Sequence, residues 1–87
     1  MNLFAWLKFV ETLATAYATS QGKDVRALGY LRVVTTAITG QQVTDADLAA
    51  LMDEYSSKVA SGAPTTAEEL AELDARIASV SAAIQGA

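Results

Sequence analysis

The residues of this sequence that could do chemistry are its carboxylates, which gather in the second half of the chain. They form two groups: Asp45, Asp47 and Asp53, then Glu68, Glu69 and Glu72. Carboxylates can hold Ca²⁺ or move protons, but the first group lacks the loop spacing and the glycine of an EF-hand. The second group falls in an expected first helical turn, where the helix dipole favours negative charge. Both groups are therefore expected to be solvated helix faces.

The residue types that usually accompany carboxylates in active sites are absent. The sequence has no histidine, which is the commonest general base and metal ligand, and it has no cysteine. No serine therefore has a histidine to activate it, and no glycine-rich phosphate loop follows a strand. We expect a protein that is not an enzyme and that binds neither a cofactor nor a metal.

Charge is divided unevenly along the 87 residues. Residues 1–42 carry a net +2 and residues 43–87 carry −6, which gives −4 overall. The first half supplies a weak basic patch, which we expect to balance the acidic half within the molecule: Lys8, Lys23, Arg26 and Arg32. Direct binding of nucleic acid is not expected of such a chain.

The N-terminal stretch Met1–Thr19 is apolar, but Lys8 and Glu11 lie in its middle. A signal peptide carries its positive charge before the apolar run, and no basic residue precedes Lys8. A membrane span needs roughly 20 apolar residues without charge. We therefore expect neither a signal peptide nor a membrane span.

Two similar stretches, offset by 22 residues, each predict the start of a helix. Thr44 is followed three residues later by Asp47, and Thr66 by Glu69. A threonine hydroxyl can accept from a free amide of the first turn, and an acid three residues on can reach back. Glu69 is expected to complete a full capping box, and the shorter Asp47 a poorer one.

The elements that position these residues are four predicted helices, at about 2–19, 24–38, 45–60 and 67–85, with a linker at 61–65. Asn2 is a candidate cap, and Gly22, Gly40 and Gly62 mark the turns. We expect one all-α domain over residues 1–87, a small four-helix bundle whose last two helices form an antiparallel hairpin. A strand at residues 33–39, which are β-branched, is the alternative, but it would have no partner strand.

Helical spacing assigns an apolar face to each segment. In the first helix Phe4 lies outside the expected stripe, which is Leu3, Trp6, Leu7, Val10, Leu13, Ala14 and Tyr17. The second helix should be the most buried, with only Gly29, Arg32 and Thr36 clearly outward. The third should bury Leu48, Leu51, Met52, Tyr55 and Val59, with Glu54 and Lys58 at ion-pair spacing. The fourth has a seam of Leu70, Leu73, Ile77, Val80 and Ile84.

Two features are candidates for contact with a partner. One is an alanine ridge opposite the last seam, which is either ordinary helix surface or a second packing face: Ala71, Ala75, Ala78 and Ala82. The other is the aromatic content of the first helix, because aromatic residues dominate interface hot spots: Phe4, Trp6 and Phe9. Phe4 has an alternative interpretation, as part of a frayed helix end.

The chain resembles small alanine-rich helical proteins of tailed-phage genomes. Val43–Leu51, which reads Val-Thr-x-x-x-Leu-x-x-Leu, and Leu70–Ile84 carry this resemblance over about half of the chain. It implies a virion or assembly component, located in the virion or the host cytoplasm, and it assigns no functional residue. We expect a non-enzymatic protein that contacts copies of itself or other particle proteins. The alternatives are an acidic adaptor or inhibitor that covers a basic protein surface, and a peripheral membrane protein using the first helix.

Overall fold

The computed structural model describes residues 3–41 and 43–86, which contain four helices and no strand. The helices are α1 (Leu3–Thr19), α2 (Val25–Gly40), α3 (Asp45–Ser61) and α4 (Ala67–Gly86). The all-α four-helix bundle is confirmed. The strand alternative for residues 33–39 is wrong, because these residues lie inside α2. The candidate cap Asn2 lies outside the described residues.

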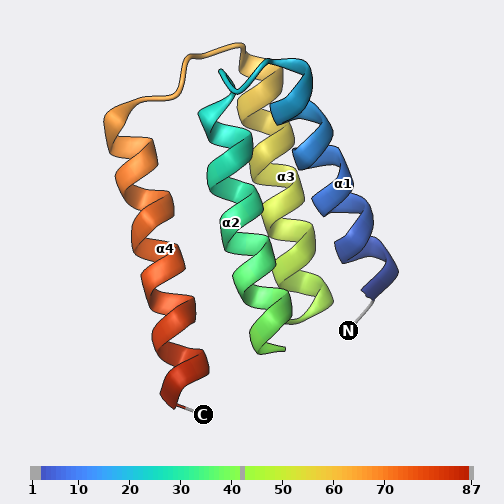
Figure 1. Cartoon of the computed structure of the whole chain (residues 1–87), viewed down its shortest axis with the longest axis vertical. Helices are drawn as coiled ribbons and strands as arrows, with labels where there is room; N and C mark the ends of the chain where they lie inside the picture. The colour runs from blue at the N-terminus through green and yellow to red at the C-terminus, as the bar shows by residue number, and fades with distance from the viewer. Residues whose placement is uncertain (1–2, 42, 87) are drawn as a thin grey trace.

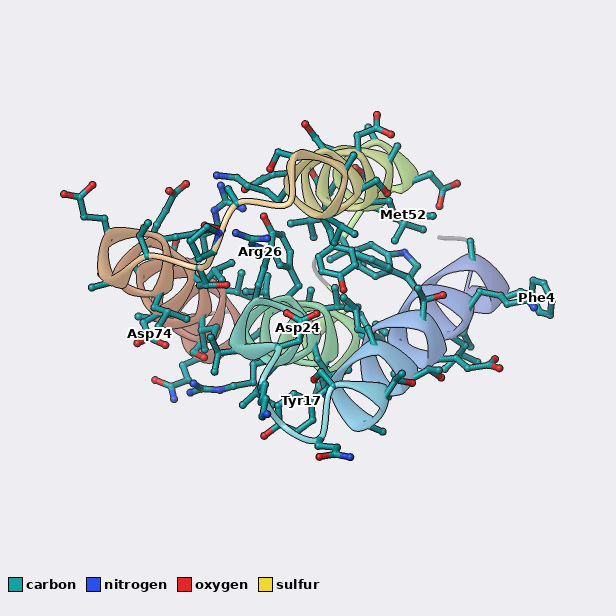
Figure 2. The ribbon with its side chains drawn as sticks, turned by 90° about the horizontal axis from the view of Figure 1, so that it is seen from above. Phe4, Tyr17, Asp24, Arg26, Met52 and Asp74 are labelled. Carbon is teal, nitrogen blue, oxygen red and sulfur yellow. The ribbon has the colours of Figure 1, made fainter. Side chains whose placement is uncertain are left out.

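Helix α2 is the centre of the bundle, with α1 and α3 on one side and α4 on the other (Figure 1 and Figure 2). It contains seven buried residues, more than any other helix, as predicted. Helices α3 and α4 run in opposite directions, as a hairpin requires (Figure 1). However, α4 packs closely on α2, to which it runs parallel, and long charged side chains connect it to α3.

Two glycines of α2 allow this close approach of α4. A Cβ atom built on Gly29 would lie 2.6 Å from Cδ1 of Leu73, and one built on Gly40 would collide with Ile84. The expectation that Gly29 faces outward is therefore wrong, because Leu73 fills the space where its side chain would be. The seam of α4 does face the core as predicted, with Leu73 buried and the other four residues half-buried.

Helix α1 lies in the angle between α2 and α3, and its buried face is rotated from the expected stripe. Trp6, Phe9 and Leu13 are buried, whereas Leu3 and Leu7 are about half exposed. Phe9 turns inward because the aromatic ring of Tyr55, on α3, offers it an edge-to-face contact at 6.1 Å between centroids. Tyr55 meets Tyr30 of α2 in the same way at 5.3 Å, so three helices share one aromatic cluster.

The helix ends follow the sequence signals with two exceptions: the end of α2 at Gly40, and the capping box expected at Glu69, whose carboxylate binds Arg26 instead. Thr44 and Asp47 form the capping box of α3, and Gly62 ends α3 in the left-handed conformation at φ +68°. Gly22 also has positive φ, as its turn requires. Gly40 does not end α2 in this way, because Gln41 adopts the left-handed conformation and Gly40 is needed at the contact with α4.

Candidate interaction surfaces

The first candidate surface is the outward face of α1, defined by Phe4, Lys8, Glu11 and Thr15. These residues follow one another at spacings of four, three and four, and all are exposed. Phe4 has 72% of its surface accessible, the highest value among the exposed large apolar residues, and its ring points away from the bundle (Figure 2). Aromatic residues are enriched at the hot spots of protein interfaces, so Phe4 remains a candidate for contact with a partner.

The other two aromatic candidates of α1 belong to the core. Trp6 is 0% and Phe9 4% exposed, so neither is available to a partner in this fold, and the prediction is corrected for both residues. The physical reason is the position of α1 between two helices, which buries a wider face than a single-sided stripe would. The indole N–H of Trp6 has no hydrogen-bond partner among the described residues.

An apolar groove runs beside this face, between α1 and α3. No charged residue lines it: the lining residues are Phe9, Thr12, Ala16, Met52, Tyr55, Ser56, Val59 and Ala60. Met52 and Val59, which were expected to be core, are 39% and 51% exposed along it, and Figure 2 shows Met52 between the two helices. The groove exists because α1 and α3 are joined through their side chains and not by close backbone packing.

The alanine ridge of α4 is a second candidate surface. Ala71, Ala75, Ala78 and Ala82 are all exposed on the side of α4 that faces away from α2. Helical spacing therefore placed the ridge on the correct side of α4. Its four methyl groups offer little apolar area and no specific polar group, so the ridge carries less binding information than Phe4.

The strongest polar site is a clamp around Arg26, near the start of α2. Its Nε donates to Oε1 of Glu69 at 2.7 Å and its Nη2 to Oε2 at 3.2 Å, and both side chains are about nine-tenths buried. The remaining guanidinium bonds reach the carbonyls of Ala63 at 2.9 Å and Lys58 at 3.3 Å. One side chain thereby joins α2 to the end of α3, the linker and the start of α4 (Figure 2).

This clamp explains why Glu69 does not complete a capping box. The amide of Glu69 does donate to the hydroxyl of Thr66 at 3.1 Å, as predicted, but its carboxylate turns to Arg26. A charged, bidentate partner is stronger than a backbone amide. The hydrogen bond from Arg26 holds the pKa of Glu69 below its ordinary value, and the same bond raises the pKa of Arg26.

A second polar cluster joins three helices along the bundle. The hydroxyl of Tyr30 donates to Glu54 at 2.8 Å, and Arg76 donates to Glu54 at 2.9 Å and to Glu72 at 2.8 Å. The spacing predicted a pair between Glu54 and Lys58, but Glu54 pairs with Arg76 instead. Burial raises the pKa of Glu54, but the bonds from Arg76 and Tyr30 outweigh it and hold the pKa below its ordinary value. Burial and the bond to Glu54 raise the pKa of Tyr30.

The charged side chains of these two clusters bind one another. Every carboxylate in them is bound by an arginine, and each arginine has a carboxylate partner. In the described ranges 3–41 and 43–86, no group of three acidic, histidine or cysteine residues could hold a metal ion. None of the helices described is long and apolar enough to cross a membrane.

Comparisons with known proteins found no matching family model, no similar curated protein and no similar solved structure. The surfaces therefore have to be interpreted from their own chemistry. The sequence located Phe4 and the alanine ridge, but not the apolar groove or the clamp. The groove depends on the distance between α1 and α3, and the clamp joins residues 43 positions apart. Neither feature can be predicted from the local periodicity of the sequence.

Proposed function

We propose that this protein is a non-enzymatic structural or assembly component that acts through helix–helix contacts, with the outward face of α1 as its main contact surface. The observation that carries the proposal is the exposed ring of Phe4, which projects from a regular helix. Leu3 and Leu7 extend this apolar end of the helix, at 48% and 53% exposure. Burial of these side chains by a partner would be favourable at about 25 cal/mol per Å².

A virion component of the tailed-phage kind is the form of this function that the sequence resemblance supports. Small particle proteins present in many copies need a cohesive fold and a contact surface more than they need a reactive site. The clamp at Arg26 and the three-helix aromatic cluster supply the first, and the apolar end of α1 supplies the second.

The acidic adaptor or inhibitor is the weaker alternative. Of the eight carboxylates in residues 43–87, four already bind arginines of the same chain: Glu54, Glu69, Glu72 and Asp74. Carboxylates that are already paired with arginines of the same chain attract a basic partner less strongly, which weakens this alternative.

The test is peptide mass spectrometry of particles purified from cells that express the protein from its native genome. The proposal expects peptides of this chain in the particle fraction, at a constant ratio to the major particle protein across density-gradient fractions. Peptides found only in the soluble fraction, with none in the particles, would contradict it.

A further inference from the structure

The residues of the outward face of α1 have no ionic partner within the described chain. Lys8 and Glu11 are exposed, and neither takes part in a salt bridge among residues 3–41 and 43–86. Four basic residues outside this face form salt bridges, and their partners are carboxylates within residues 54–74. They are Arg26, Arg32, Lys58 and Arg76. The outward face therefore carries one positive and one negative charge that are both open to another molecule.

Large and small residues are separated along this face. Phe4 projects at its beginning, and a shallow hollow lies towards its end, lined by Lys8, Glu11, Thr12, Thr15 and Ala16. Thr12 and Ala16 also line the uncharged groove between α1 and α3, so the hollow lies next to the groove. The face thus has a projecting ring at one end and a place for an apolar group at the other.

We propose that this face binds the same face of a second copy, with the two α1 helices antiparallel about a two-fold axis. When the two helices pair antiparallel about a point between residues 9 and 10, the numbers of two facing residues add up to 19. Phe4 then meets Thr15 of the second copy and lies over its hollow. In the same register Lys8 meets Glu11, and by symmetry Glu11 meets Lys8.

One register thus satisfies both the shape and the charge of the face. At about 1.5 Å of rise per residue, Phe4 and Thr15 each lie about 8 Å from the axis, on opposite sides of it. A parallel pairing would place Lys8 against Lys8 and Glu11 against Glu11, which repel. Two-fold pairing through one self-complementary patch is the commonest arrangement of soluble homo-oligomers.

The inference specifies the partner for the contact surface of the proposed function, and a charge exchange tests it in the whole chain. Sedimentation equilibrium over a wide concentration range should show a monomer–dimer equilibrium for the unmodified protein. Phe4→Ala should raise the dissociation constant by at least about tenfold, because one aromatic anchor is lost from each half of the two-fold interface. Lys8→Glu and Glu11→Lys should each weaken the dimer by a similar factor, since each places like charges together twice.

The double variant Lys8→Glu/Glu11→Lys should return the dissociation constant to within about threefold of the original, because the two charges exchange places across the axis. The matched control is Ala75→Glu on the alanine ridge, which should leave the constant unchanged. Circular dichroism should show that all variants keep their helix content, because every altered side chain is exposed.

A protein that stays monomeric at every concentration would overturn the inference, as would a double variant as weak as the single ones. Loss of the dimer in Ala75→Glu would move the interface to α4 and also overturn it. The proposed function fails separately, if the chain is absent from particles. A monomer found in particles would leave the function standing and replace the second copy by another particle protein.

Discussion

Arg26 and Glu69 are joined by two hydrogen bonds, at 2.7 and 3.2 Å, that connect the first turn of α2 to the first turn of α4. The pair is almost fully buried, and Arg26 also holds the carbonyl of Ala63 in the linker. Because α4 has close backbone packing only with α2 among the described helices, this pair and the glycine contacts fix where α4 lies. The position of α4 in the bundle therefore depends strongly on this one buried ion pair.

Removing one member of this pair should be costly. Arg26→Ala should lower the free energy of unfolding by about 3–5 kcal/mol, because it leaves the carboxylate of Glu69 buried without its partner. Urea denaturation measures this. The matched control is Arg32→Ala, whose pair with Asp74 is exposed at both ends and should contribute less than about 1 kcal/mol. Equal losses in the two variants would show that the clamp is not special.

Acid should weaken the bundle through Glu69 and Glu54. Both carboxyls have a pKa held below their ordinary value of 4.5, the first by Arg26 and the second by Arg76 and Tyr30 against the effect of burial. A lowered folded-state pKa gives stability that is present above pH 4.5 and is lost as the pH falls below it. Unfolding free energies measured from pH 7 to pH 2 should decline below pH 4.5. The decline should be shallower in Glu69→Gln, and an unchanged slope there would contradict this assignment.

The glycines of α2 should resist replacement by a better helix former. Gly29→Ala and Gly40→Ala should each destabilise the protein by about 1–3 kcal/mol, because the new methyl group has to displace Leu73 or Ile84. The control is Gly86→Ala, where the added Cβ would meet no other described part of the chain within 4 Å, apart from its chain neighbours and the backbone of its own helix. Thermal melts of the three variants provide the comparison. Stabilisation by Gly29→Ala, which helix propensity alone predicts, would mean that α4 packs elsewhere.

The two faces of α4 should respond differently to substitution. Leu73→Ala removes a buried side chain and should cost about 2–5 kcal/mol. Ala78→Glu, on the exposed ridge, should change the stability by less than about 0.5 kcal/mol. Urea melts with similar shifts for both variants would show that the seam and the ridge have been assigned to the wrong faces.

These contrasts show which parts of the fold can be predicted from the local sequence. The four helices, the cap at Thr44, the turn at Gly62 and the seam of α4 all depend on neighbours within one or two turns, and the sequence predicted them. The role of Gly29 and the rotation of α1 depend on which helix lies opposite. A glycine among polar neighbours looks outward on a helical wheel, and only its contact with Leu73 reveals otherwise.

The candidate surfaces divide in the same way. The exposure of Phe4 could be predicted, because helical spacing places this apolar residue outside the apolar stripe of α1. The burial of Phe9 could not, since its partner Tyr55 is 46 positions away. The partner of Glu69 was missed for a related reason: the capping box was a complete local explanation, and only the distant Arg26 offered a stronger bond.

The central claim is that the outward face of α1 is the contact surface in the assembled particle. Hydroxyl-radical footprinting, read by peptide mass spectrometry, tests it on the purified chain and on intact particles. Phe4, 72% exposed, should be oxidised in the purified chain and protected in particles, because a partner that covers the ring excludes water from it. Trp6, which is fully buried, should stay unreactive in both and so report that the fold is intact. Equal oxidation of Phe4 in the two samples, with Trp6 protected in both, would contradict the claim.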